Sequence, residues 1–491
     1  MARLLPSETF DANARDALRN ESLRGALRRA TDLFGERRRA AVGDVPAWEE
    51  LRERARRIKE DALANLDRYL EEFTARAEEA GAVVHFARDA REACETVARI
   101  AREAGAERIV KSKSMTTEEI HLNDALASGG PLPVETDLGE WIIQLADETP
   151  SHIIVPAIHK TREEIARLFA DREVLDGDAA ETDVDALTRA ARRALREHFA
   201  AAELGISGAN FAVAETGSIL ILENEGNARM TTSLPRVHVA VLGIEKVIPR
   251  FADLEVFLRL LPRSGTGQHL TSYQSILTGP VREGGEGPRE LHLVFLDNGR
   301  SGMLRERVTR QSLACIRCGA CLNACPVYQQ VGGHAYGSVY PGPIGAVITP
   351  QLAGLEKAAQ LPFASSLCGA CRDVCPVKID IPELLLHLRS RVVEGPGLPT
   401  GGPAPRRRRG ERLAFRLWSW TMAGPRRYRL AWAVARPLQR LAARGGRAGR
   451  LAARLCPPFA AWTAARELRP AAARSFRAQW RRELSRGEAG R

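Results

Sequence analysis

The sequence predicts an open α/β sheet domain, followed by a cysteine-rich helical module and a basic helical tail. Strand-like and helix-like segments alternate from residue 61 to residue 300, as they do in α/β proteins. Seven of the nine cysteines lie between Cys315 and Cys375, and 23 arginines crowd residues 401–491. We therefore divide the chain into a helical segment at 1–60, the α/β domain at 61–300, a cysteine-rich domain at 301–395, a linker at 396–410 and a basic helical domain at 411–491.

Helical periodicity dominates the N-terminal part, and the α/β alternation follows it. Between Trp48 and Ala80, apolar residues recur near helical spacing within a strongly charged sequence. The glycine-bearing stretches Gly205–Gly208 and Gly284–Gly287 are expected to be loops. The expected strands are 82–86, 108–111, 152–156, 211–222, 237–242 and 291–296. The expected helices are 90–104, 116–127, 162–170, 183–199, 252–261, 303–314, 348–354 and 381–393.

The cysteines form two closely spaced runs. The first has the spacing C-x2-C-x2-C-x3-C-P, which is typical of bacterial [4Fe–4S] proteins, and the second ends in the same C-x3-C-P. In two-cluster proteins of this kind, the last cysteine of each run binds the other cluster. The sequence therefore predicts a first cluster bound by Cys315, Cys318, Cys321 and Cys375, and a second bound by Cys325, Cys368 and Cys371.

The second run is one cysteine short. Ser365 stands three residues before Cys368, where a complete run would have a cysteine. Three outcomes remain open for the second cluster: a [3Fe–4S] cluster, a fourth ligand other than cysteine, such as Ser365, or an iron with an open position.

Structural zinc and disulfides are the alternatives to iron–sulfur clusters. Zinc sites usually combine two C-x2-4-C pairs or mix cysteine with histidine, whereas cysteine triplets with Cys-Pro endings favour iron–sulfur. Disulfides would need an oxidising compartment, and Met1–Phe10 is not the apolar region of a secretory signal. Thiolate ligands without an export signal predict a cytoplasmic protein.

The charge is divided unevenly along the chain. The formal net charge is +11, but residues 401–491 carry +19, which leaves −8 for residues 1–400. No apolar run reaches the 18 residues of a membrane-spanning helix. The tail segments Leu413–Met422 and Arg427–Leu441 have the pattern of basic amphipathic helices with tryptophan. They could dock on the acidic body, on a partner subunit or on the inner membrane surface. No nucleic-acid-binding motif appears, so we expect no nucleic acid partner.

Polar loops of the α/β domain offer a candidate site for a small ligand, without a readable mechanism. Lys111 and Lys113 lie between an expected strand and an expected helix, where backbone amides could hold an anion, although a plain helix cap explains the pattern equally well. Glu215 precedes a strand and is the first carboxylate to consider for chemistry. This domain contains no GxGxxG or P-loop motif, and catalytic residues remain unassigned.

Taken together, several long motifs resemble those of the lactate-utilisation B family of iron–sulfur proteins. They are Lys111-Ser112-Lys113-Ser114-Met115, Glu135-Thr136-Asp137-Leu138-Gly139-Glu140, Ala214-Glu215-Thr216-Gly217-Ser218, Gly265-Thr266-Gly267-Gln268, Gly332-Gly333-His334-Ala335-Tyr336-Gly337 and Ser366-Leu367-Cys368-Gly369-Ala370-Cys371. The resemblance covers nearly the whole chain. It implies a LUD-type α/β domain similar to the NagB/CoA-transferase fold, then a ferredoxin-like module with two [4Fe–4S] clusters and a basic C-terminal domain.

The resemblance also implies a function. Members of the family look like electron carriers in the oxidation of L-lactate to pyruvate, and they work with two companion subunits. The missing eighth cysteine at Ser365 then looks like the norm for the family. Two other hypotheses remain. The α/β domain could itself bind or convert an acyl or hydroxy acid, with Glu215 as the first residue to test, or the chain could be chiefly a scaffold.

Overall fold

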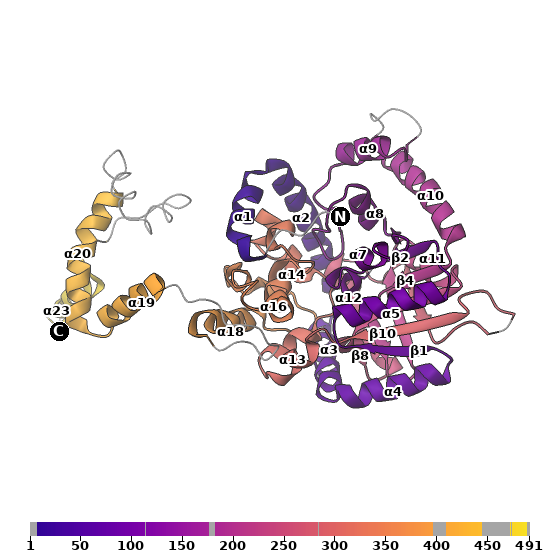
Figure 1. Cartoon of the computed structure of the whole chain (residues 1–491). Helices are drawn as coiled ribbons and strands as arrows, with labels where there is room; N and C mark the ends of the chain where they lie inside the picture. Colours follow the sequence, from indigo (N-terminus) through magenta and orange to yellow (C-terminus); the bar gives the residue numbers. More distant parts are fainter. Residues whose placement is uncertain are drawn as a thin grey trace. The chain divides into compact units, whose positions relative to one another are not determined.

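The computed structural model describes residues 7–112, 114–175, 182–282, 284–395, 409–443, 472 and 474–488. Residues 1–405 form one compact unit and residues 406–491 form a second (Figure 1). The mixed α/β core and the cysteine-rich region that follows it both lie in the first unit, and the α/β fold class predicted from the alternating segments is confirmed.

A parallel sheet of six strands forms the centre of the α/β core. Its order is β1-β10-β7-β4-β2-β3, and every neighbouring pair is parallel. Strands β4 and β7 are buried along their whole length, as expected where helices cover both faces of a parallel sheet. The strands are β1 (Val83–Ala87), β2 (Ile109–Ser112), β3 (Val134–Glu135), β4 (Leu204–Ser207), β7 (Val237–Gly243) and β10 (Glu290–Leu296).

Helices and a second, smaller sheet cover the parallel sheet. One face packs on α5 and α7, and the other packs on α4 and the smaller sheet. Helices α8, α9 and α10 share a core with β2. The helices are α5 (Ala90–Glu103), α6 (Met115–Glu119), α7 (Leu122–Ala127), α8 (Leu138–Leu145), α9 (Arg162–Asp171), α10 (Val184–Ala201), α11 (Asn227–Ser233) and α12 (Leu254–Gly265). The smaller sheet has the order β8-β5-β6-β9, with β5 (Phe211–Val213), β6 (Ser218–Glu223), β8 (Val247–Ile248) and β9 (Tyr273–Leu277).

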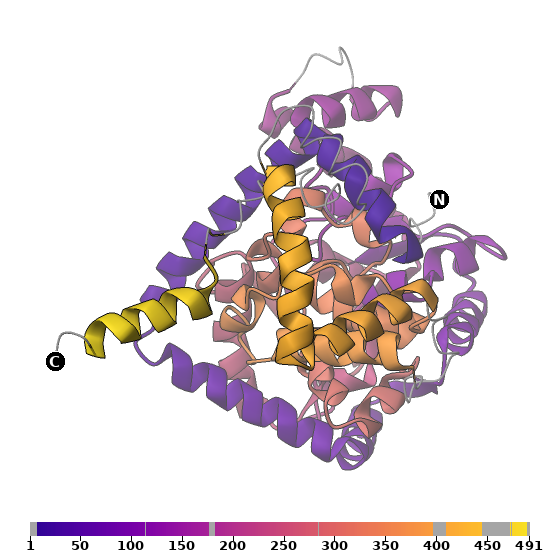
Figure 2. The ribbon, with the colours of Figure 1, turned by 90° about the vertical axis from the view of Figure 1, so that its left-hand side faces the viewer.

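Four N-terminal helices follow the edge of the first unit in succession (Figure 2). The first three share one apolar core with the cysteine-rich module, in which Leu27 and Leu51 pack among the same buried residues as Tyr328 and Leu384. The N-terminal helices are α1 (Phe10–Arg19), α2 (Glu21–Gly43), α3 (Trp48–Ala64) and α4 (Leu66–Glu79). The module contains α13 (Arg300–Arg305), α14 (Ala320–Asn323), α15 (Tyr328–Val331), α16 (Gly342–Ala353), α17 (Ala370–Asp373) and α18 (Ile381–Glu394).

Two sequence expectations were wrong because of local hydrogen bonds and close packing. Residues 152–156 are not a strand, since the His152 ring accepts hydrogen bonds from the backbone N–H groups of Ile154 and Val155 and so closes a turn. The stretch 205–208 is not a loop, because most of it belongs to β4. A glycine is needed in this strand, since a Cβ atom on Gly205 would lie 1.9 Å from the carbonyl oxygen of Thr231 in α11.

Three other expected elements are interrupted. Residues 211–222 form the β5–β6 hairpin with a turn at Gly217. The helix expected at 116–127 is broken at His121, whose φ of 53° does not continue a right-handed helix. The helix expected at 303–314 divides into α13 and the 3-10 turn Thr309–Ala314.

In its described residues, the second unit contains α19 (Arg409–Met422), α20 (Pro425–Ala443) and α23 (Phe476–Glu488). Within it, the Arg427 guanidinium lies 4.8 Å from the ring centre of Trp420, and both Trp418 and Trp420 are 58% exposed. In the part of the chain that the structure describes, no helix has both the length and the apolar composition needed to cross a membrane.

We predict that Gly205→Ala lowers the free energy of unfolding by about 1–3 kcal/mol, because the added methyl group forces β4 and α11 apart. Gly43→Ala is the control, since its Cβ would meet no atom within 4 Å. Denaturant unfolding of both variants measures the difference. Equal stability of the two variants would contradict the close approach at Gly205.

Candidate iron–sulfur site

The two cysteine runs have the same backbone conformation. In the first run, Arg317 and Gly319, which flank Cys318, have positive φ angles of 59° and 74°. In the second run, Leu367 and Gly369, which flank Cys368, have positive φ angles of 55° and 87°. A short helix then begins in each run, α14 in the first and α17 in the second. Since positive φ is uncommon at residues other than glycine, the agreement indicates two copies of one ligand loop.

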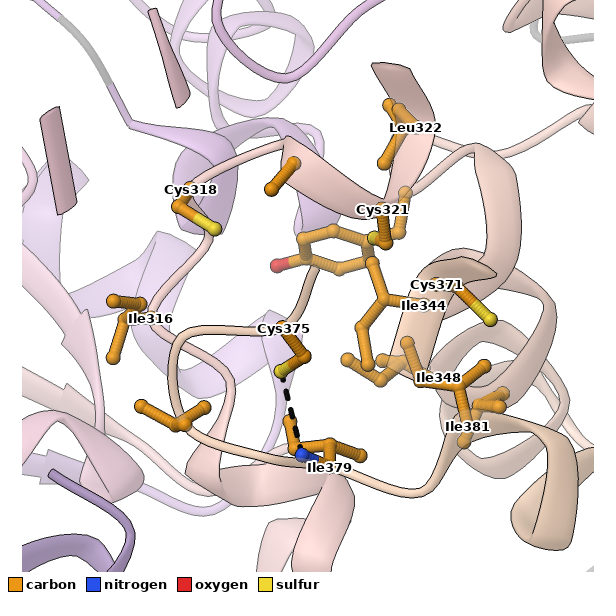
Figure 3. Packing of buried hydrophobic residues seen from close by; sticks show 14 of the residues in the cluster. Ile316, Cys318, Cys321, Leu322, Ile344, Ile348, Cys371, Cys375, Ile379 and Ile381 are labelled. Carbon is orange, nitrogen blue, oxygen red and sulfur yellow. Dashed lines mark hydrogen bonds between the residues drawn. The ribbon is translucent and has the colours of Figure 1, made fainter. Parts of the chain in front are cut away.

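Four cysteines line one cavity, and they come from both runs. In Figure 3, the sulfur atoms of Cys318, Cys321 and Cys375 face a common space, whereas that of Cys371 points away from it. Cys315 lines the same cavity. This is the set of four ligands that the sequence predicts for the first cluster.

The chemistry of these thiols suits a metal cluster. Burial raises the pKa of Cys375 to about 11, and burial together with the charge of Cys375 raises the pKa of Cys318. The three buried thiols of Cys318, Cys321 and Cys375 cannot all ionise this close together without a neighbouring positive charge. Bound iron supplies that charge, so the residues present fit the predicted cluster.

Of the seven cysteines in the two runs, the remaining three, Cys325, Cys368 and Cys371, form the second group. Burial, followed by the charge of Cys325, raises the pKa of Cys371 to about 12, and Cys368 contributes to the same shift. Cys325 belongs to the first run, so each run sends its last cysteine to the other group. Cys368 is exposed at the surface, whereas Cys325 and Cys371 are buried.

Ser365 occupies the place in the second loop that Cys315 has in the first. The backbone N–H of Arg317 donates to Cys315 Sγ at 3.4 Å, and the N–H of Leu367 donates to Ser365 Oγ at 3.1 Å. The Ser365 hydroxyl therefore lies where the fourth ligand atom of a complete second run would lie.

Backbone N–H groups also contact the crossing cysteines. Tyr328 donates its N–H to Cys325 Sγ at 3.5 Å, and Ile379 donates its N–H to Cys375 Sγ at 3.3 Å (Figure 3). Hydrogen bonds to cluster sulfurs are among the factors that set reduction potential. The loops after both Cys-Pro pairs thus contribute to the electronic surroundings of the clusters.

Two arginines of the N-terminal helices hold the second run in place, and the sequence analysis missed both. Arg52 of α3 donates two hydrogen bonds to the carbonyl oxygen of Cys375, at 3.0 and 2.7 Å. Arg38 of α2 donates to the carbonyl oxygen of Val374 at 3.2 Å. No local signal marks either residue, because their partners lie more than 300 positions away in the sequence.

A buried charge network joins the α/β core to the first loop. Arg300 bonds both oxygens of Glu119, at 2.9 and 2.8 Å, and Glu245 at 2.7 Å. Tyr340 donates its hydroxyl to Glu119 at 2.6 Å, and Arg317 lies 3.7 Å from Glu245. Although burial opposes ionisation, Arg300 and Arg317 lower the pKa of Glu245 to about 2.

The polar residues singled out in the α/β domain do not meet in one site. The Lys111 ammonium is buried and paired with Glu118 at 2.5 Å and Glu135 at 2.8 Å. Lys113 lies outside the described residues. Glu215 is exposed in the β5–β6 turn and accepts the backbone N–H of Phe251 at 2.7 Å.

In the described ranges, no three histidine, cysteine, aspartate or glutamate side chains converge closely enough to hold a single metal ion. A cubane cluster does not require such convergence, because each cysteine binds a different iron around the cluster. The arrangement of the cysteines around the cavity therefore suits a cluster and not a single metal ion.

Comparison with known proteins identifies three family models along the chain. They are the LUD domain at residues 70–296, the 4Fe-4S dicluster domain at 311–379 and the C-terminal domain of lactate utilisation protein B at 387–485. The dicluster match confirms the prediction of iron–sulfur clusters.

Proteins similar to this chain match most of its length. Lactate utilization protein B of Geobacillus kaustophilus is 43% identical and covers 95% of both chains. The Bacillus subtilis protein of that name is 44% identical over 81% of this chain and 82% of its own. An uncharacterized electron transport protein of Escherichia coli, YkgF, is 43% identical over 85% of each. A crystal structure of a duf162 family protein from Deinococcus radiodurans covers 47% of this chain and 98% of its own at 15% identity, with a TM-score of 0.25, too low for a structural conclusion.

We predict that Cys375→Ser removes the first cluster and spares the second, although Cys375 belongs to the second run. Anaerobically reconstituted wild-type protein should bind about eight iron, or about seven with a [3Fe–4S] cluster, and the variant should lose about four. Iron analysis and EPR of the reduced protein measure this. Cys94→Ser is the control, because the Cys94 thiol donates to the carbonyl oxygen of Ile120 and packs in the core around α5, apart from both cysteine groups. Loss of the second signal in place of the first would refute the crossed assignment.

We also predict that Ser365→Cys completes the second thiolate set, since its side-chain atom already lies at the ligand position. The variant should bind as much iron as wild type or more, with an altered EPR signal for the second cluster only. Ser366→Cys is the matched control at the exposed neighbouring position. An unchanged second signal in Ser365→Cys would show that position 365 does not reach the iron.

Proposed function

The chain belongs to the lactate utilisation protein B family, and from this premise we propose that it is an iron–sulfur electron carrier in the oxidation of L-lactate to pyruvate. In this proposal it works with two companion subunits in the cytoplasm, and substrate oxidation occurs on a companion. The observation that carries the proposal is the pairing of one buried cysteine group with one group that reaches the surface.

The two groups differ in their access to solvent. Cys318, Cys321 and Cys375 are all at most 9% exposed, and Cys315, the fourth member of the first group, is half-buried. In the second group, Cys368 is exposed. When bound, the clusters supply one-electron transfer. A carrier needs one redox group near its surface, and the second group meets this need.

The surface around Cys368 has features of a docking site for a partner protein. Phe363 is 48% exposed, and the Arg389 guanidinium lies 5.1 Å from the centre of its ring. Arg389 also donates to the carbonyl oxygens of Pro362 and Ser365, at 2.8 and 3.0 Å. This arginine therefore holds the loop in a fixed shape, and a fixed shape lowers the entropic cost of binding.

The tail offers a second contact surface. In the second unit, α19 and α20 present exposed tryptophans among arginines. Such helices suit a companion subunit or the anionic inner face of a membrane, where each basic residue contributes about 1 kcal/mol. We propose that this unit keeps the carrier close to its partners.

The experiment combines the purified holoprotein with its purified companion subunits under anaerobic conditions. L-lactate should reduce the iron–sulfur EPR signals when the companions are present and should leave them unchanged with this chain alone. The variant Phe363→Ala should slow reduction severalfold while keeping the iron content, and Val393→Ala, at another exposed apolar position, should not. Clusters that stay oxidised in the complete mixture would refute the carrier function and favour a scaffold.

A further inference from the structure

A second cavity lies in the first unit beside the cysteine cavity. It has a volume of about 140 Å³ and is partly open to solvent, and its walls come from the loops that follow β2, β4 and β6, the end of α12 and the first cysteine loop. Ile153 and Arg317 line both cavities. These two residues therefore form part of the wall between the second cavity and the four cysteines of the first cluster.

Two cations of this cavity have unused hydrogen-bonding capacity. Lys246 is only 9% exposed, and its ammonium has neither a hydrogen bond nor an ion pair with any of the described residues. Arg317 is also largely buried, and its Nη1 is without a hydrogen-bond partner. A buried ammonium that lacks a partner is costly, so its presence points to an anion that is bound in the functional state.

The first cluster site accounts for Lys246 only in part, since the lysine feels the charge of Cys315 but faces another cavity. This lysine lines the second cavity and is absent from the walls of the cysteine cavity. Nearby, Arg300 and Arg317 both pair with the Glu245 carboxylate, whereas Lys59 donates to the backbone carbonyl oxygen of Glu245. Glu245 therefore does not fully neutralise the cations around it, and the second cavity has a positive end at Lys246 and Arg317.

Part of the remaining wall is apolar, and the rest is polar and includes Glu140 and Glu223. Ile154, Ile221, Leu222 and Leu261 contribute to the apolar part. One ammonium and one guanidinium nitrogen are two donor groups, which match the two oxygens of a carboxylate. A ligand with a carboxylate at the positive end and a small carbon body against the apolar part of the wall fits this arrangement.

We propose that the second cavity binds a small organic carboxylate, with Lys246 and Arg317 as its anion-binding residues. The ligand lies against the loop that carries Cys315 and Cys318. The α/β domain is thus a ligand-binding domain whose occupancy is sensed at the first cluster. This inference is independent of the carrier function proposed above, since binding requires neither companion subunits nor a particular direction of electron flow.

Isothermal titration of the anaerobic holoprotein with L-lactate, pyruvate and inorganic phosphate tests the proposal. One carboxylate should bind saturably at one site per chain. Lys246→Met should weaken binding at least about tenfold, or about 1.4 kcal/mol. Ala209→Phe, which places a large side chain in the cavity at a position that carries no charge, should abolish binding. Lys357→Met, at an exposed lysine of the cysteine-rich module, is the matched control and should bind as wild type does.

Iron content and EPR of the same samples show that each variant is folded and loaded. Carboxylate binding should alter the EPR signal that Cys375→Ser removes, because Arg317 lies between two ligands of that cluster. The proposal is overturned if neither carboxylate binds, if phosphate binds more tightly than both, if Lys246→Met binds as wild type does, or if the first signal is insensitive to ligand. Normal reduction by the companion subunits in the absence of carboxylate binding would leave the carrier function standing.

Discussion

The crossing of the two cysteine runs is the constraint on which the rest of the unit depends. Cys375 must reach the cavity of the first run, and Cys325 must reach the second group. Neither run can complete its site alone, so the two loops have to be held in one fixed relative position. The shared core of the module and the N-terminal helices provides this rigidity, and Arg52 fixes the backbone at Cys375 itself.

Basic residues are also concentrated around the first cluster site. The first cluster site is surrounded by basic residues from three parts of the chain: Arg38 and Arg52 from the N-terminal helices, Lys59 and Lys246 near the edge of the sheets, and Arg317 from the loop itself. Positive charge stabilises thiolates and the reduced form of a cluster. The exposed second group has no comparable shell in its described surroundings, since the charges that act on its cysteines are those of the cysteines themselves.

The sequence predicted the features that are encoded locally. Cysteine spacing indicated the ligand groups, and alternating patterns indicated β1, β2, β7 and β10. Prediction failed where contacts that the sequence pattern does not show determine the local structure. Gly205 looked like a loop residue because its packing partner, Thr231, lies on another element, and 152–156 looked like a strand because the His152 ring was not expected to bind the backbone. Lys246 carried no signal at all, since only the folded chain shows that its ammonium is buried without a partner.

The shared core of α1–α3 and the cysteine-rich module has a consequence for synthesis of the protein. Arg52 leaves the ribosome 323 residues before Cys375, its hydrogen-bond partner. The parts of the first three helices that contact the cysteine-rich module therefore stay uncovered until most of the chain has been translated. Contacts this distant slow folding and prolong exposure to aggregation. Assembly of the first cluster is delayed in the same way, because its set of four cysteines is complete only after residue 375 has emerged.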